Sequence, residues 1–118
     1  MESRPATARF AAGRLTCFGG RREAGETPED CLRRELQEEL GWRPEALEMQ
    51  VALWVAGELI AWFYRADCAL AVDQLRLPPG YQAVWVAPAD LCQHPLSPWH
   101  AAVLAAWQAG QSIVELNQ

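Results

Sequence analysis

Three glutamates, Glu35, Glu38 and Glu39, have the spacing that a helix would bring to one face. Carboxylates three and four residues apart on a helix repel each other, and the repulsion grows when they are partly desolvated. A hard divalent cation relieves it, and Mg²⁺ typically binds carboxylates together with phosphate oxygens of a substrate. The spacing therefore points to metal-assisted chemistry on a phosphorylated molecule. Taken alone, three clustered glutamates on a helix more often form a solvated acidic face without function.

Local signals predict the helix that would carry these glutamates, over residues 28–40. Thr27 is a good N-cap, Pro28 suits the first helical position, and Gly41 can end the helix in a left-handed conformation. An apolar stripe recurs every four residues beside the acidic face, and it consists of Leu32, Leu36 and Leu40. Because this stripe must be buried, the carboxylates are expected at the edge of the core.

The residues around the helix strengthen the functional interpretation. Gly19 and Gly20 predict a tight loop with free carbonyl groups before the helix. Glu26 lies just before the cap and can reach back toward the acidic face. Arg34 stands four residues before Glu38, where it can orient a carboxylate.

Residues 20–42 match the Nudix box in spacing: a glycine, five residues, a glutamate, seven residues, then R-E-hydrophobic-x-E-E-x-G-hydrophobic. Only Trp42 is unusual, because an aliphatic residue is more common there. The chain thus resembles the Nudix hydrolases. This resemblance implies an α/β fold, an α/β/α sandwich around a mixed sheet. It also implies hydrolysis of a nucleoside diphosphate linked to a group X, with Mg²⁺ or Mn²⁺.

The resemblance also implies roles for individual residues. The metal ligands would be the Gly19 carbonyl and the three box carboxylates, and the supporting catalytic residues would be Glu26 and Arg34. The general base varies within the family, and it is either a box glutamate or an acid on a later loop. Asp73 and Asp90 are the later candidates, although each is more often a surface residue or a helix cap.

The substrate is only weakly indicated. Residues 9–20 resemble the lead-in of the MutT-like branch, which acts on oxidised purine nucleoside triphosphates. Candidate substrate contacts are Phe18 in that lead-in, Arg21 and Arg22 after the glycines, and Trp85 as a stacking platform. The two arginines could equally be exposed, solubilising residues.

The start of the chain departs from the family pattern. Only 18 residues precede Gly19, where Nudix domains usually have one or two strands, and residues 1–5 resemble the segment that normally comes after such a strand. We therefore expect a shortened N-terminus. The fold could be a trimmed variant, the true start could lie upstream, or a neighbouring chain could fill the gap in a homodimer. A non-catalytic Nudix-fold binding or regulatory module is the alternative function.

Composition predicts one Nudix domain over residues 1–118, with 51% hydrophobic residues and most of its six tryptophans in the core. A net charge of −5 without lysine argues against long nucleic acids and favours a small nucleotide as partner. Neither a leader nor a membrane-spanning run is seen. Four cysteines without C-x-x-C spacing predict a reduced, cytoplasmic protein.

The remaining sequence predicts a second set of elements. Residues 47–56 and 58–68 are expected to form a hairpin around Gly57. A short strand is expected over 81–86, a helical turn over 88–91 and a helix from about 98 to 109. Residues 112–116 are expected as a final strand.

Overall fold

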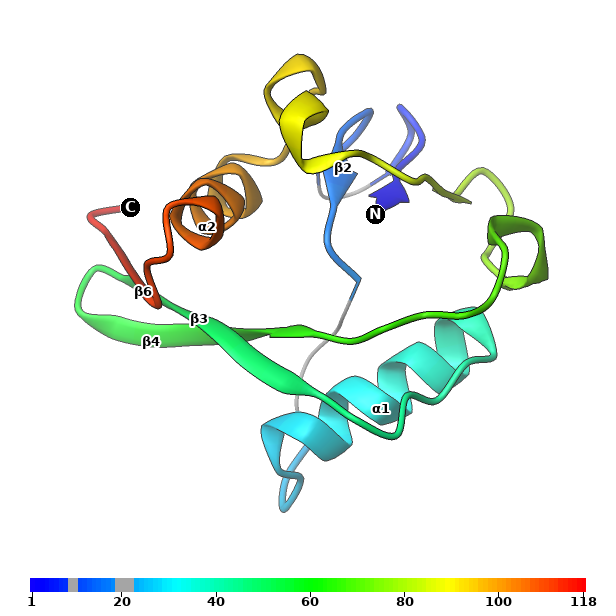
Figure 1. The fold of residues 1–118 in the computed structure, drawn as a ribbon, viewed down its shortest axis with the longest axis horizontal. Helices are drawn as coiled ribbons and strands as arrows, with labels where there is room; N and C mark the ends of the chain where they lie inside the picture. Colours follow the sequence, from blue (N-terminus) through cyan, green and yellow to red (C-terminus); the bar gives the residue numbers. More distant parts are fainter. Residues whose placement is uncertain (9–10, 19–22) are drawn as a thin grey trace. The chain divides into compact units, whose positions relative to one another are not determined.

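The computed structural model describes residues 1–8, 11–18 and 23–118. The chain forms two compact units, and both have segments from distant parts of the sequence (Figure 1). The first unit comprises Met1–Glu45 and Cys68–Ser97, and the second comprises Ala46–Asp67 and Pro98–Gln118. Helices and strands occur in both units, so the predicted α/β class is confirmed.

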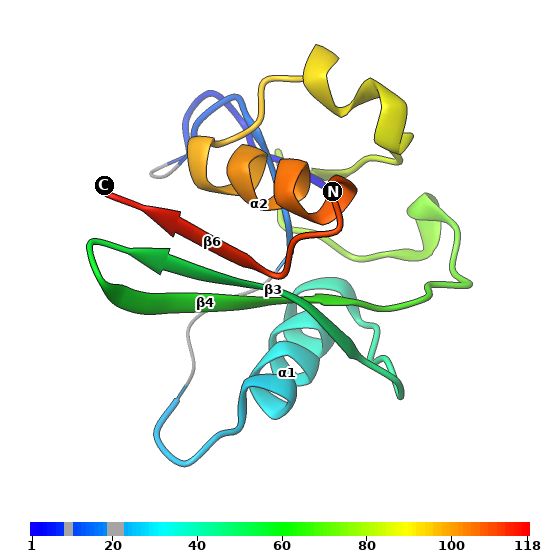
Figure 2. The ribbon, with the colours of Figure 1, turned by 60° about the vertical axis from the view of Figure 1, so that its left-hand side comes forward.

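A three-stranded mixed sheet organises the second unit. Strands β3 (Glu48–Val55) and β4 (Glu58–Arg65) form an antiparallel hairpin, and β6 (Ile113–Leu116) pairs in parallel with the other edge of β3 (Figure 2). The hairpin turn consists of Ala56 and Gly57, with φ angles of 52° and 81°. Positive φ at both positions is typical of the two-residue turns that match strand twist. The predicted hairpin and final strand are therefore confirmed.

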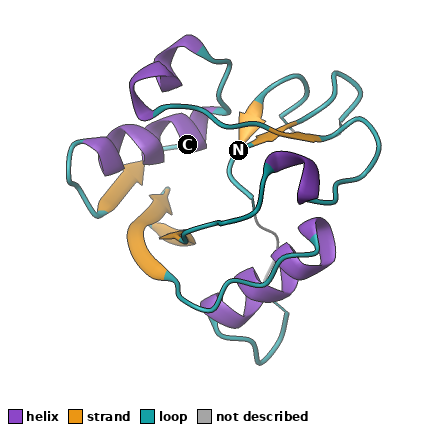
Figure 3. Cartoon of the chain, turned by 45° about the vertical axis from the view of Figure 1, so that its right-hand side comes forward, coloured by secondary structure: helices purple, strands orange, loops and turns teal. Residues whose placement is uncertain are grey.

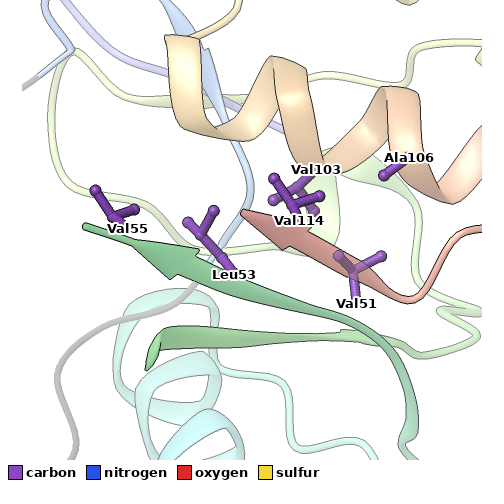
Figure 4. Packing of buried hydrophobic residues seen from close by; sticks show 6 residues of the cluster. All are labelled: Val51, Leu53, Val55, Val103, Ala106 and Val114. Carbon is purple, nitrogen blue, oxygen red and sulfur yellow. The ribbon is translucent and has the colours of Figure 1, made fainter. Parts of the chain in front are cut away.

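Aliphatic side chains build the core of the second unit. Helix α2 (Pro98–Gln108) packs on β3 and β6, and side chains from all three elements meet between them (Figure 4). The cluster consists of Val51, Leu53, Val55, Val103, Ala106 and Val114. Its three β3 members alternate along the strand, as the two-residue period of side-chain direction requires.

The first unit has short strands and long connections (Figure 3). Strands β1 (Glu2–Ser3), β2 (Leu15–Thr16) and β5 (Gln82–Ala83) form an antiparallel sheet in the order β2-β1-β5. The unit also holds helix α1 (Pro28–Leu40) and the 3₁₀ helices η1 (Val72–Gln74) and η2 (Pro88–Gln93). Residues 1–5 thus include a strand that the sequence did not reveal, because two residues are too few to show an alternation.

Two further expectations require correction. The strand expected over 81–86 is only β5, and Trp85 lies beyond its end with 68% of its surface exposed. None of the six tryptophans is fully buried, so the prediction that most belong to the core is wrong. Trp54 shows the reason: it lies between Leu53 and Val55 on β3 and points to the opposite face of the strand. None of the described helices has the length and apolar run needed to cross a membrane.

Candidate active site

Helix α1 has the bounds that its local chemistry predicts. The Thr27 side chain accepts a hydrogen bond from the Asp30 N–H at 3.1 Å, and Pro28 occupies the first turn. Gly41 adopts φ 69°, and its N–H donates to the Gln37 carbonyl at 3.1 Å. Both helix ends therefore satisfy backbone groups that would otherwise lack partners.

The apolar stripe of α1 fixes where its carboxylates lie. Leu36 and Leu40 are buried, with 4% and 2% of their surface exposed. Among the neighbouring acids, the Glu35 side chain is 16% exposed and that of Glu38 is 60% exposed, while Glu39 is half-buried. The glutamates thus run from the margin of the core to solvent, as the helical spacing predicts.

Arg34 ties the acidic residues together. Its Nε and Nη2 donate to the two carboxylate oxygens of Glu26 at 2.7 and 3.0 Å, a two-pronged pairing. Its Nη1 lies 3.0 Å from Glu35 Oε1 and 3.2 Å from Glu38 Oε2. The hydrogen bonds from Arg34 lower the pKa of Glu26, and the same pairing raises the pKa of Arg34. The structure thereby brings together the supporting pair and two of the predicted metal ligands.

The carboxylate of Glu39 has a strongly raised pKa. Burial raises its pKa to about 7, and the charges of Glu2 and Glu35 together with a hydrogen bond to Glu35 add to the shift. Such a shift means that the ionised form is disfavoured in this environment. A bound cation would relieve this, and an all-carboxylate donor set suits a hard divalent ion such as Mg²⁺.

Glu2 is a neighbour of this cluster that sequence reasoning missed. It lies on β1 with 8% of its surface exposed. Its Oε1 accepts from Arg4 Nη1 at 3.3 Å and from the Thr16 hydroxyl at 3.4 Å. Burial raises the pKa of Glu2, although Arg4 counteracts this. No local motif marks this residue, because it lies on a strand of two residues far from α1 in the sequence, and its link to the cluster is the effect of its charge on the pKa of Glu39.

An open groove of about 430 Å³ runs along the acidic face of α1. It is lined by Glu35, Glu38, Glu39, Arg76, Leu77 and Pro78. This volume falls in the range of small-molecule sites, roughly 300–1,000 Å³. Within the described ranges, no three acidic, histidine or cysteine side chains are close enough together to hold one metal ion. The three predicted ligands Glu35, Glu38 and Glu39 therefore line one wall of the groove, but their carboxylates do not converge on one metal position.

The other predicted site residues lie elsewhere. Phe18 is half-buried and Trp85 is exposed, and neither lines the groove. Asp73 and Asp90 occupy the first turns of η1 and η2, also outside the groove. The remaining predicted site residues, Gly19, Arg21 and Arg22, lie outside the described residues.

A family model described as the NUDIX domain matches residues 3–107. The matched range contains the whole of α1 and every residue that lines the groove.

Proposed function

The chain belongs to the Nudix family, whose members hydrolyse nucleoside diphosphate derivatives, and we propose that it does so itself. In this proposal the protein cleaves a pyrophosphate bond in a nucleoside diphosphate linked to a group X and depends on Mg²⁺ or Mn²⁺. The observation that carries the proposal is the groove along α1, because the three box glutamates line it together.

The chemistry of the side chains assigns their proposed roles. Glu35, Glu38 and Glu39 would hold the cation, and the Gly19 carbonyl would be a further ligand. When bound, the cation supplies a water of lowered pKa and neutralises charge on the pyrophosphate. Arg34 positions Glu35 and Glu38 while Glu26 fixes the guanidinium, so the carboxylates are oriented before the substrate arrives.

We also propose identities for the general base and for the class of substrate. We assign the base to a box glutamate, since Asp73 and Asp90 lie outside the groove. The MutT-like lead-in favours a nucleoside triphosphate, including oxidised purine forms. Phe18, Arg21, Arg22 and Trp85 remain proposed substrate contacts, although Phe18 and Trp85 do not line the groove and would contact a part of the substrate outside it.

The test measures phosphate and pyrophosphate release in millimolar Mg²⁺ across canonical and oxidised nucleoside triphosphates, ADP-ribose, NADH, nucleotide sugars and dinucleoside polyphosphates. We expect release from one class, and we expect Glu38→Gln to reduce it about a hundredfold or more, because a cation ligand is lost. Glu45→Gln is the matched control, since Glu45 is an exposed glutamate of the same unit that does not line the groove. Equal loss in both variants would contradict the assignment of the site.

A non-catalytic Nudix-fold binding module is the second candidate. It is favoured by the finding that, across residues 1–8, 11–18 and 23–118, no three metal-ligating side chains converge on one point. Silence across the substrate panel, from a folded protein that binds Mg²⁺, would select this candidate.

The proposal also covers the extent of the domain, the cellular location and the oligomeric state. The family match covers residues 3–107 and so includes parts of both compact units, which supports one Nudix domain over residues 1–118. All four cysteines are free thiols, which supports a reducing, cytoplasmic location. A homodimer stays a prediction, and sedimentation of the purified chain tests it.

A further inference from the structure

Arg76 lines the groove but has no assigned role in the proposed hydrolysis. Of the six residues that line the groove, three are glutamates, two are apolar and Arg76 is the cation. An anionic substrate entering this space meets the carboxylates of Glu35, Glu38 and Glu39. Arg34 pairs with the first two from outside the groove, and Arg76 is the one cation among the residues that line it. Among the described residues, Arg76 forms no ion pair with a carboxylate, so its guanidinium is available to a ligand.

The backbone holds Arg76 at the end of α1. Its N–H donates to the Leu40 carbonyl at 3.0 Å, which fixes this residue to the last turn of the helix. Its guanidinium lies over Gly41, where an added Cβ would come within 2.5 Å of Arg76 Nε. A glycine is therefore required at position 41 both for φ 69° and for the close approach of Arg76.

We propose that Arg76 is a substrate-binding residue that receives phosphate oxygens of the nucleotide in the groove beside the box glutamates. A guanidinium presents a planar fork of N–H donors that matches phosphate geometry, and its charge does not depend on pH in the physiological range. Arg76 supplies positive charge from the protein to a wall that is otherwise acidic. This inference deepens the proposed function and rests on it, since both place the phosphate chain in this groove.

A structural role would be the competing explanation. The last turn of α1 contains no basic residue, and a cation near a helix C-terminus is stabilising. In that case Arg76 would contribute to the free energy of unfolding and not to ligand affinity. Replacing Arg76 with a neutral side chain separates the two roles. Loss of a phosphate contact would weaken ligand binding, whereas loss of a structural contact would lower the free energy of unfolding.

The experiment compares Arg76→Gln and Arg76→Lys with wild type, using calorimetric titration with inorganic pyrophosphate in Mg²⁺ and thermal unfolding. Arg43→Gln is the matched control, because Arg43 is exposed in the same unit but does not line the groove. We expect Arg76→Gln to weaken pyrophosphate binding roughly ten- to a hundredfold, as for a lost hydrogen bond to a charged group. Arg76→Lys should fall between wild type and Arg76→Gln, and Arg43→Gln should match wild type. On a substrate found by the panel, KM should rise more than kcat falls.

The outcomes separate this inference from the proposed function. Arg76-dependent pyrophosphate binding without turnover would support the inference and remove the hydrolase. Turnover that is unchanged in Arg76→Gln would keep the hydrolase and overturn the inference. A lowered unfolding temperature with unchanged pyrophosphate affinity would also overturn it, in favour of the structural role. Wild type that binds no pyrophosphate would overturn it as well. If Arg76→Gln does not fold, the pyrophosphate affinity of Arg76→Lys, which keeps the charge, is the test. An affinity below that of wild type would support the inference, and an unchanged affinity would overturn it.

Discussion

The second unit takes its order from a long hairpin, a helix and six clustered aliphatic residues, whereas the first unit has strands of two residues. In the second unit the charged residues lie mostly on exposed positions. In the first unit, carboxylates and arginines form a connected set around α1, and several of them are half-buried. Both units belong to one small chain and use very different interactions.

The contrast separates what stabilises the fold from what does the chemistry. Close-packed aliphatic side chains contribute stability in proportion to the surface they bury. Partly buried like charges oppose stability, unless a counter-charge or a ligand balances them. Substitutions in the aliphatic cluster of the second unit are therefore expected to change mainly unfolding, and those in the charged set around α1 to change mainly activity and ion binding.

Leu53→Ala should give the largest effect on stability. Leu53 is 1% exposed within the aliphatic cluster, and a buried Leu→Ala change costs about 2–5 kcal/mol of unfolding free energy. Denaturant titration measures this, with Ile113→Ala as the control because Ile113 is 59% exposed. A loss for Leu53→Ala no greater than that of the control would remove the proposed division between the units.

Arg34→Lys should change activity more than folding. Lysine keeps the charge but cannot reproduce the two-pronged pairing with Glu26 while also reaching Glu35. Residues that orient metal ligands typically account for about 10- to 100-fold in activity or metal affinity, and we expect a loss of that size. Steady-state kinetics and Mg²⁺ titration measure it, with Arg43→Lys as control. Unchanged Mg²⁺ affinity and rate in Arg34→Lys would show that the orientation of these glutamates does not matter.

Gly41→Ala and Gly110→Ala compare the two units directly. Both glycines have positive φ, 69° and 75°, so alanine at either position costs about 1–2 kcal/mol of conformational free energy. Only at Gly41 does the added Cβ also meet a side chain, the guanidinium of Arg76. We expect thermal unfolding to show the greater loss for Gly41→Ala and pyrophosphate titration to show weaker binding for that variant alone. Equal behaviour of the two variants would mean that Arg76 moves aside without consequence.

The pH dependence of stability should give the smallest effect. The pKa of Glu39 is about 7, raised from an ordinary value of 4.5, so between these values the folded chain keeps a proton that the unfolded chain has released. The free energy of unfolding should therefore fall as pH rises from 4.5 to 7, by about 1 kcal/mol after allowance for solvent screening. Denaturant titrations in EDTA measure it, and Glu39→Gln should lack this component. Added Mg²⁺ should restore stability at neutral pH in wild type and not in the variant.

Features set by neighbouring residues could be predicted from the sequence. The bounds of α1 follow from Thr27, Pro28 and Gly41, and the hairpin follows from two apolar runs around a glycine. Residues that reach the site through long-range pairing could not be predicted. Glu2 belongs to a strand too short for a pattern, and Arg76 joins the groove through one backbone hydrogen bond to Leu40.

The position of Arg34 has a consequence for how mutations combine. One guanidinium contacts Glu26, Glu35 and Glu38, so these three acids have one partner in common. Effects of mutations at residues with a shared partner do not add. Removal of Glu26 would free the guanidinium to pair more fully with the other two acids, and the effect of each later substitution would then depend on the order in which changes were made. For directed evolution, these positions are best randomised together with Arg34 in one library.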